Sequence, residues 1–463
     1  MQQSGRMMAS NDPRVSAASI VARIESLPFS SWDVRIAASV GAATFFDAFD
    51  ALTIAFILPS IIHEWHLTTF HAAALVSVGY AGQAVGAVVV GALAERFGRV
   101  PALVAAVAAL GICSLICAST QTFAQLLLAR FAQGIGLGGE VPVAAAYLSE
   151  MIRFDRRGKV FMLYQSTFGI GITAASIAGS LIVPSYGWRA MFLIGCIPAA
   201  LAVVIARICP ESPRWLADNG HLLEADRVMA RIERQVFKGL PPPPHSIRSP
   251  TDTSSFARSK GWATLFSDKY LSRTVAVCSL WITAYACTYA ITIWVPTLLT
   301  HVYGLGVRSA LNLSVITSTA GSLGIGALAL FVDRVTRRVV FFGGFAATVV
   351  VLLTLAAIVE PQVATTIAGV ALAMFFLFIL TSALYLYTPE LYPTRVRALG
   401  TGFASFCLRV TAIGTPFGMG VLVQHGQPVL IYFILGSIAG IGALVSFFWV
   451  VDTRGRSLED TSR

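Results

Sequence analysis

Apolar residues run along the chain in segments of the length that crosses a bilayer. The hydrocarbon core of a membrane takes a helix of about 20 mostly apolar residues, and polar stretches separate the segments. The pattern predicts 12 transmembrane helices, at about 34–62, 71–94, 100–118, 122–148, 158–182, 188–207, 273–300, 309–332, 338–358, 362–389, 398–422 and 427–451. We therefore expect an all-α membrane protein.

The predicted helices fall into two groups of six around a polar segment. We expect an N-terminal tail over 1–33, a six-helix bundle over 34–207, a linker over 208–272, a second six-helix bundle over 273–451 and a tail over 452–463. Ile20, Val21, Ile24 and Leu27 recur at helical spacing, which predicts a short interfacial helix in the first tail.

The two halves repeat each other. Glu150 after the fourth span corresponds to Glu390 after the tenth, and Glu95 of the 2–3 loop corresponds to Asp333 of the 8–9 loop. Two similar bundles with a site between them are the plan of a secondary transporter, in which one bundle rocks against the other.

The position of the charged residues along the chain indicates how the protein lies in a membrane. Hydrophobic residues make up 56% of the chain and charged residues 12%, about half the share of a soluble protein. The net charge of +10 would suggest nucleic acid as a partner, yet 29 of the 33 Lys and Arg residues fall on one side of the predicted helices. Such a bias orients a membrane protein. We expect a multi-pass protein of the cell (inner or plasma) membrane with both termini cytoplasmic and no nucleic-acid partner.

Catalytic chemistry has no sequence signal here. The chain lacks a phosphate-binding loop, a Ser/His/Asp spacing and a clustering of His with Cys that would bind a metal. We expect no enzyme activity, no catalytic residue, no cofactor and no metal. An ATP-driven pump is excluded, and a monomer suffices for the two-bundle plan.

Four motifs resemble the major facilitator superfamily. The 2–3 loop reads Gly91-Ala-Leu-Ala-Glu95-Arg96-Phe-Gly98-Arg99, with Glu where the superfamily usually has Asp, and the fourth span carries Arg130 before a Gly-rich run. Pro210 to Leu216 and Glu390 to Arg395 are similar to the branch that holds sugar porters and organic-ion transporters. The resemblance covers the whole chain and implies the two-bundle fold.

Three short sequence elements and one Arg narrow the resemblance. Phe46-Asp47-Ala-Phe-Asp50 is similar to an element of aromatic acid/proton symporters. Gly138 to Ala144, Tyr387 to Glu390 and an Arg in span eleven resemble bacterial niacin (nicotinate) transporters. These elements imply a carrier of small organic acids.

Five ionisable residues lie inside the predicted spans: Asp47, Asp50, Arg130, Glu140 and Arg409. A charge at the bilayer centre costs at least about 2.5–3.5 kcal/mol, so each is a functional hypothesis. Asp47 and Asp50 share one helix face at i,i+3 spacing, and two close carboxylates cannot both ionise cheaply. We expect Asp47 to be the principal proton site and Asp50 to tune it. Alternatively, the two acids are a structural pair neutralised by Arg130 or by backbone groups.

The remaining three charges also allow alternatives. In the major facilitator superfamily an Arg at the position of Arg130 is associated with proton coupling, but Arg130 would equally stabilise helix packing. Arg409 lies midway along span eleven, where a planar bidentate donor suits a carboxylate substrate. Otherwise Arg409 is only the partner of Glu140. Glu140 is thus either a second proton site or that partner.

An aromatic stripe in span seven suggests a ligand ring. Trp281, Tyr285 and Tyr289 recur at i, i+4 and i+8, so their rings share a face on which an aromatic ligand would stack. The same stripe also suits helix packing. Tyr385, Tyr387 and Gln165 are further candidates for lining the substrate site.

Charged and glycine positions at the cytoplasmic helix ends form a candidate gate: Gly91, Glu95, Arg96, Gly98, Arg99, Glu150, Arg157, Glu211, Arg214, Glu390 and Arg395. In related carriers ion pairs of this kind close the inner gate. The alternative is a set of solvated loop charges, since exposed pairs contribute little.

The leading function is therefore a proton-coupled symporter. It would import a small organic anion, an aromatic or heteroaromatic carboxylate such as nicotinate or a benzoate, by alternating access. A sugar or polyol symporter of the same fold and an exporter of drugs or metabolites are the alternatives.

Overall fold

The computed structural model describes residues 16–237, 265–331, 334–358, 362–392, 394–424 and 428–452. No β-strand occurs within these ranges, where the regular structure is helical. The expectation of an all-α protein is therefore confirmed for the described part of the chain.

The helices follow the predicted apolar segments closely. The first half contains α2 (Ser31–Trp65), α3 (Thr69–Phe97), α4 (Arg99–Ser119), α5 (Phe123–Met151), α6 (Phe154–Tyr186), α7 (Arg189–Ile194) and α8 (Ile197–Ile208). The second half contains α11 (Asp268–His301), α12 (Val307–Phe331), α13 (Arg337–Ala357), α14 (Val363–Glu390), α15 (Thr394–Gln424) and α16 (Pro428–Trp449). The sixth predicted span is divided between α7 and α8.

Eleven spans in the described part of the chain are long and apolar enough to cross a membrane. Helix α5 is not among them, although its 29 residues rise about 43 Å, more than the hydrocarbon core requires. Its apolar content is lowered by Arg130, Gln133, Glu140 and a run of glycines. These polar residues belong to the two buried clusters described below.

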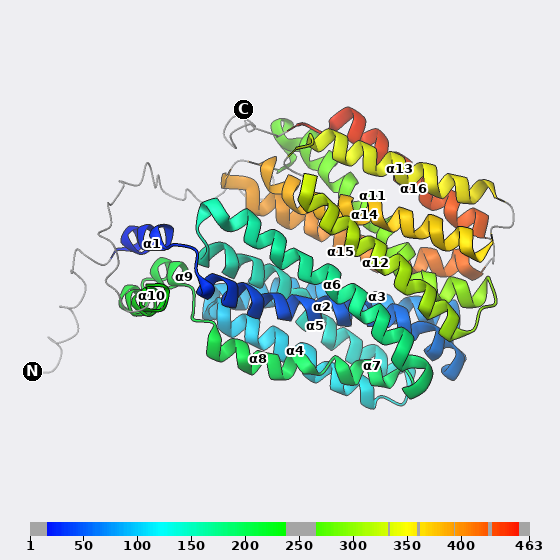
Figure 1. The fold of residues 1–463 in the computed structure, drawn as a ribbon, viewed down its shortest axis with the longest axis horizontal. Coiled ribbons are helices and arrows are strands. Elements are labelled where there is room, and N and C mark those ends of the chain that lie inside the picture. Colours follow the sequence, from blue (N-terminus) through cyan, green and yellow to red (C-terminus); the bar gives the residue numbers. More distant parts are fainter. Residues whose placement is uncertain are drawn as a thin grey trace, which may run out of the picture.

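The same packing order occurs in both halves (Figure 1). In the first half α5 packs on α3 and α4, α2 packs on α6, and α8 packs on α4. In the second half α14 packs on α12 and α13, α15 packs on α11, and α16 packs on α13. The halves meet through α3 with α15, α6 with α12 and α2 with α11. In chain order α2, α3 and α6 are the equivalents of α11, α12 and α15, so the contact of α3 with α15 is equivalent to that of α12 with α6. This symmetry is expected for two repeats related by an approximate two-fold axis.

Polar contacts join the halves at equivalent places. The Ser77 hydroxyl on α3 donates to the Ile413 carbonyl on α15 at 2.7 Å. The hydroxyls of Thr173 on α6 and Ser322 on α12 lie 2.8 Å apart. Both are partly buried contacts of uncharged hydroxyls, and neither is an ion pair.

Glycines bring α3 and α5 into backbone contact. A Cβ on Gly82 would lie 2.2 Å from the Phe131 carbonyl oxygen, and one on Gly138 would lie 2.0 Å from the Gln83 oxygen. Any residue with a Cβ would clash at these distances, so the glycines let the two backbones come into contact. The close approach fixes the positions of Arg130 and Glu140 on α5 relative to α3.

A small helical unit lies at one end of the first half (Figure 1). It consists of α1 (Ala17–Ser26), α9 (Pro213–Asp218) and α10 (Leu222–Val236), which contact one another. The helix expected near Ile20 is present as α1. Its apolar face differs from the expectation of a membrane interface, because Ile20 and Ile24 are buried in a cluster with Ala225 and Met229 of α10.

Candidate functional site

Three charged side chains from three helices meet where the two halves face each other. Asp47 on α2 and Glu140 on α5 are 5% and 0% exposed, and Arg409 on α15 is half-buried. The charges of Glu140 and Arg409 both act on the Asp47 carboxylate. We call Asp47, Glu140 and Arg409 the central cluster.

The two acids of the central cluster are incompletely hydrogen-bonded. The Thr44 hydroxyl, one turn before Asp47, donates to Glu140 Oε1 at 2.9 Å. Glu140 Oε2 and Asp47 Oδ1 are buried and have no hydrogen-bond partner among the described residues. A buried carboxylate oxygen without a donor is costly, so these atoms mark a place where water, a proton or a ligand is expected.

The Arg409 guanidinium also makes few hydrogen bonds. Its Nη2 donates to the Gly138 carbonyl at 3.4 Å, and within the described residues it forms no ion pair at 4.0 Å or less. The predicted alternative, Arg409 as the ion-pair partner of Glu140, is therefore not what this conformation contains. The guanidinium keeps most of its five donors available for a ligand.

Asp50 belongs to a different network, although it lies one turn from Asp47. The Ser114 hydroxyl on α4 donates to Asp50 Oδ2 at 2.8 Å, and the Gln133 amide donates to Ser114. Arg130 Nη1 then donates to Gln133 Oε1 at 2.6 Å. We call Asp50, Ser114, Arg130 and Gln133 the inner cluster. It contains one acid and one base, and its helices all belong to the first half.

The break between α7 and α8 makes room for the inner cluster. A Cβ on Gly195 would lie 2.3 Å from Asp50 Oδ1 and 2.7 Å from the Ser114 hydroxyl. Pro198 near the start of α8 then favours a new helix after the interruption. The sequence pattern predicted one continuous span here, and the contact with Asp50 coincides with the break.

Aromatic rings of α11 continue from the central cluster into the second half. The centroids of Trp281 and Tyr285 lie 5.3 Å apart with nearly parallel planes, and those of Tyr285 and Tyr289 lie 5.5 Å apart. Tyr385 packs edge-on against Trp281 at 4.9 Å. The predicted stripe thus does share one face, which Tyr80 of α3 extends by packing 4.9 Å from Tyr289.

The stripe also reaches the charges of the central cluster. Both Tyr289 and Tyr385 lie close enough to Arg409 and Asp47 to interact with them electrostatically. Tyr80 and Tyr164, which the sequence did not single out, interact with Asp47 in the same way, and the Tyr80 hydroxyl has no hydrogen-bond partner among the described residues. Thr44 was also missed, although its i−3 spacing from Asp47 is a signal that could have found it.

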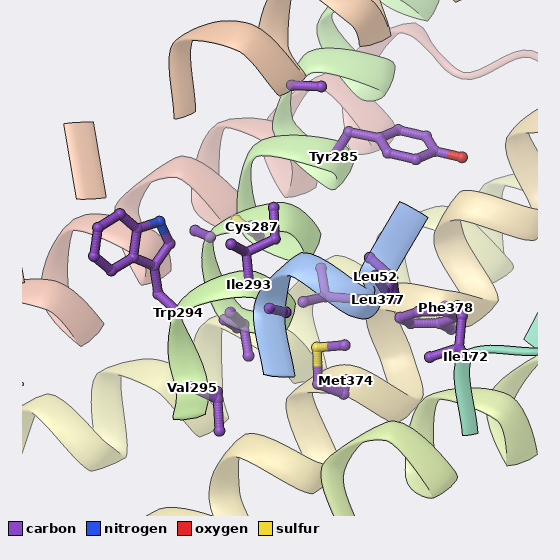
Figure 2. Packing of buried hydrophobic residues seen from close by; sticks show 14 of the residues in the cluster. Leu52, Ile172, Tyr285, Cys287, Ile293, Trp294, Val295, Met374, Leu377 and Phe378 are labelled. Carbon is purple, nitrogen blue, oxygen red and sulfur yellow. The ribbon is translucent and has the colours of Figure 1, made fainter. Parts of the chain in front are cut away.

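Apolar side chains of both halves gather beyond Asp47 along α2. Figure 2 shows Leu52 of α2, beyond Asp47 along the helix, beside Leu377 and Phe378 of α14. Leu52 is buried in a single apolar cluster with Met374, and with Ile293 of α11. Beyond Asp47, α2 therefore contributes apolar side chains to a cluster that also includes residues of the second half.

Two of the predicted lining residues differ in their surroundings. Gln165 on α6 is half-buried. The Tyr387 hydroxyl accepts a hydrogen bond from the Val451 backbone N–H at 3.0 Å, and its ring packs on Phe341 at 5.1 Å. Tyr387 is therefore a packing residue inside the second half in this conformation, and the structure does not bring it to the central cluster.

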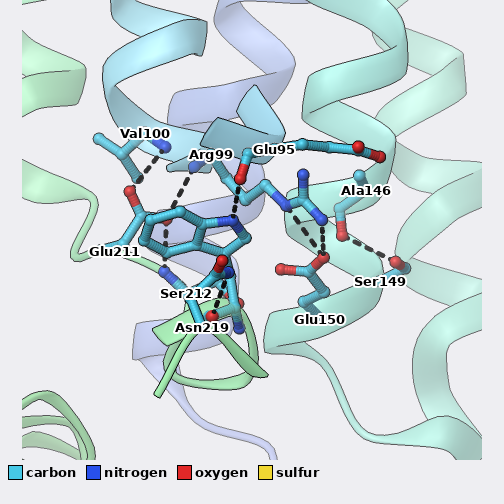
Figure 3. A network of polar contacts seen from close by, with 10 residues as sticks. Glu95, Arg99, Val100, Ala146, Ser149, Glu150, Glu211, Ser212 and Asn219 are labelled. Atoms are coloured by element: carbon cyan, nitrogen blue, oxygen red, sulfur yellow. Dashed lines mark hydrogen bonds and ion pairs between the residues drawn. The ribbon is translucent and has the colours of Figure 1, made fainter. Parts of the chain in front are cut away.

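The charged residues of the candidate gate form a network at the ends of α4 and α5 (Figure 3). Arg99 Nη2 lies 3.0 Å from Glu150 Oε1. The backbone N–H groups of Arg99 and Val100 donate to Glu211 at 2.9 and 3.2 Å. Burial raises the pKa of the Glu211 carboxyl, and these backbone donors act in the opposite direction. Gly98 has φ +110°, and a Cβ there would lie 2.3 Å from Glu211 Oε2.

The second half contains an equivalent network in a different local sequence. Arg337 Nη2 lies 2.9 Å from Glu390 Oε1, and the Arg337 backbone N–H donates to Asp452 Oδ1 at 3.2 Å. Arg337, Glu390 and Asp452 therefore correspond to Arg99, Glu150 and Glu211. Each pair joins helices of one half, so the predicted ion pairs between helix ends are present within the halves.

The other candidate gate residues have varied places. Arg214 on α9 pairs with Glu25 on α1 at 2.6 Å. The Glu95 and Arg96 side chains are exposed, and a Cβ on Gly91 would meet no atom within 4 Å. The side chains of Arg157 and Arg395 lie outside the described residues.

Comparison with known proteins decides the family. The profile of the family described as "Sugar (and other) transporter" matches residues 32–463. The chain belongs to this family of the major facilitator superfamily. It is accordingly a transporter and not an enzyme, and a multi-pass protein of the cell membrane.

Individual relatives cover nearly the whole chain. The niacin transporter NiaP of Acinetobacter baylyi is 30% identical over 95% of this chain and 99% of its own length. A gallate transporter of Pseudomonas putida is 27% identical over 91% of this chain and 92% of its own length. Among solved structures, a partially occluded inward-open form of the xylose transporter XylE from E. coli has TM-score 0.72 at 18% identity, covering 92% of this chain and 100% of that one. The last likeness establishes the major facilitator fold.

Proposed function

We propose that this transporter imports a small aromatic or heteroaromatic carboxylate, such as nicotinate or a benzoate, together with protons by alternating access. The observation that carries the proposal is the Arg409 guanidinium, which has no ion pair among the described residues and interacts electrostatically with Tyr289 and Tyr385. We further propose that α5 is a twelfth span, that both termini are cytoplasmic and that the protein works as a monomer.

The substrate would contact the two halves at once. Its carboxylate would take a bidentate pair of hydrogen bonds from Arg409, and its ring would lie against the face formed by the tyrosines of α11 and by Tyr80, which packs on Tyr289. Because Arg409 and α11 belong to the second half and Tyr80 to the first, binding would couple to the relative position of the halves.

Asp47 is the proposed proton site. It lies at the boundary between the halves, is buried, and has an oxygen without a hydrogen-bond donor. Asp50 also has one oxygen without a donor, but its other oxygen accepts a hydrogen bond from Ser114, and Gln133 links Ser114 to Arg130 within the first half. The proposed role of the inner cluster is therefore to hold α2, α4 and α5 in place, and so to position Asp47.

A sugar or polyol symporter is the second candidate, since the family description names sugars and a relative of known structure carries xylose. A neutral polyol would leave the Arg409 charge unpaired in a low-dielectric cavity, which is costly. The resemblance to the niacin and gallate transporters favours an organic anion instead.

The ion pairs at the helix ends would act as part of the gate. Arg99–Glu150 and Arg337–Glu390 hold the ends of their helices within each half. We infer that these pairs keep each half rigid while the halves move, and that the surfaces they present meet when the inner side closes.

A ligand panel tests the proposal. The purified chain in detergent would be heated with benzoate, 4-hydroxybenzoate, nicotinate, glucose or inositol while its unfolding temperature is recorded, because a ligand that binds the folded state raises that temperature. We expect aromatic carboxylates to stabilise it and sugars to leave it unchanged. Stabilisation by glucose or inositol alone would overturn the proposed substrate class.

A further inference from the structure

The charges buried in the membrane do not balance when all of them are ionised. The inner cluster contributes one acid, Asp50, and one base, Arg130, so its charges cancel. The central cluster contributes Asp47, Glu140 and Arg409, which sum to −1. No further Asp, Glu, Lys or Arg lies in the interior of the predicted spans.

This excess negative charge has no partner in the described part of the chain. Neither Asp47 nor Glu140 forms an ion pair there, and each has a buried oxygen without a hydrogen-bond donor. An unpaired carboxylate away from water is costly and takes up a proton instead. With one proton shared by the two acids, the empty central cluster is neutral.

The neighbours of the two acids differ. Glu140 is fully enclosed, and Thr44 and Tyr164 beside it belong to α2 and α6 of the same half. Asp47 has Asp50, Tyr80, Tyr164 and Glu140 on its own half, and it faces Tyr289, Tyr385 and Arg409 of the second half. The named neighbours of Glu140 therefore stay with it when the halves move apart, whereas Asp47 loses three of its neighbours.

From this juxtaposition, and resting on the proposed function, we propose that Glu140 keeps a resident proton and that Asp47 exchanges one proton for each carboxylate carried, so that transport is electroneutral. When the substrate anion binds Arg409, the guanidinium no longer balances Asp47. Asp47 then takes one proton from the outer side, and the loaded cluster is neutral again. On the inner side the anion leaves Arg409 and the proton leaves Asp47, which restores the starting charges.

The proposal fixes the driving force. One anion and one proton together carry no charge, so a pH gradient would drive accumulation of about tenfold per pH unit, since each unit is worth about 1.4 kcal/mol. A membrane potential alone would drive none. Two exchanged protons for each anion would instead make the potential effective.

Full-length protein in proteoliposomes tests this stoichiometry. Radiolabelled nicotinate or benzoate accumulation would be measured with the pH gradient and the valinomycin-clamped K⁺ potential varied separately, and passive entry into protein-free vesicles subtracted. We expect a proton-to-substrate ratio of one. Accumulation driven by potential alone, or a ratio of two, would overturn the inference while leaving the substrate class intact. Absence of carrier-mediated uptake for every aromatic carboxylate would instead overturn the proposed function.

Two variants separate the roles of the acids. Asp47→Asn should still exchange internal for external substrate, which also shows that it is folded, but should lose accumulation driven by the pH gradient. Glu140→Gln should change the uptake rate and keep a ratio of one, because an amide resembles the protonated acid. Exposed Glu224→Gln on α10 serves as the matched control. A ratio of one in Asp47→Asn together with lost coupling in Glu140→Gln would contradict the assignment.

Discussion

The inner and central clusters contain the same kinds of side chain but differ in how their hydrogen bonds are used. In the inner cluster Arg130 reaches Asp50 through Gln133 and Ser114, all within the first half. In the central cluster Arg409 makes one long contact with a carbonyl, and Asp47 and Glu140 each keep an oxygen without a donor. Asp50 Oδ1 and Arg130 Nε also lack a partner among the described residues, so the difference lies in the link between acid and base. Hydrogen bonds join Asp50 to Arg130 within one half and hold its helices together, whereas no such chain joins Asp47 or Glu140 to Arg409 across the boundary, which leaves these groups available for a ligand and a proton.

The largest effect on transport should follow from replacing Arg409. Arg409→Ala should abolish uptake of an aromatic carboxylate and weaken its binding by at least about 100-fold, because hydrogen bonds to charged groups contribute about 1.5–3 kcal/mol each. Binding to detergent-purified protein measures the loss, and Arg308→Ala, an exposed Arg on α12, is the matched control. An unchanged KM in Arg409→Ala would refute the role.

Removing the base of the inner cluster should act on stability instead. Arg130→Ala leaves the Asp50 carboxylate without its positive partner, and breaking a buried pair in this way costs about 3–5 kcal/mol. We expect a clear fall in unfolding temperature for Arg130→Ala and little change for Arg409→Ala. If the two variants lost equal stability, the distinction between the clusters would not stand.

A smaller effect should come from crowding the inner cluster. Gly195→Ala would place a Cβ 2.3 Å from Asp50 Oδ1, and overpacking a closely packed site typically costs about 1–3 kcal/mol. Gly326→Ala on α12 is the control, since a Cβ there meets no atom within 4 Å. Thermal unfolding of both variants should show a loss only in the first.

The smallest effect concerns the helix-end network. Because burial raises the pKa of Glu211, folding favours its protonated form, so stability should decline as pH rises from the ordinary glutamate value through the raised one. Glu211→Gln should flatten that part of the profile of unfolding temperature against pH. An unaltered profile would show that the carboxyl of Glu211 does not titrate in this range.

Local sequence patterns accounted for much of the fold and for part of the site. Apolar length placed the spans, and i,i+4 spacing placed Trp281, Tyr285 and Tyr289 on one face. Spacing also placed Asp47 and Asp50 together, but their different partners come from α4, α5 and α15, which only tertiary packing brings near. The spacing between Glu95 and Arg99 recurs between Asp333 and Arg337, but the contact of Arg337 with Asp452 depends on tertiary packing.

Helix α1 illustrates the same limit. The spacing of Ile20 and Ile24 predicted an amphipathic helix, and the helix is present. An apolar face looks alike in sequence whether lipid or protein covers it. The contacts with α10, supported by the Arg23 ion pairs to Asp226 and Glu233 at 2.6 and 2.7 Å, are made by residues roughly 200 positions away.

The most direct test of the account compares an acid with its amide at the central cluster. Binding of nicotinate and nicotinamide, and of benzoate and benzamide, would be measured by calorimetry on the wild-type chain and on Arg409→Ala. We predict that the wild type binds one or both carboxylates at least about tenfold more tightly than the matching amide, a difference of about 1.4 kcal/mol, and that Arg409→Ala removes this preference. Equal affinity for acid and amide in the wild type would contradict the claim that Arg409 selects the substrate by its charge.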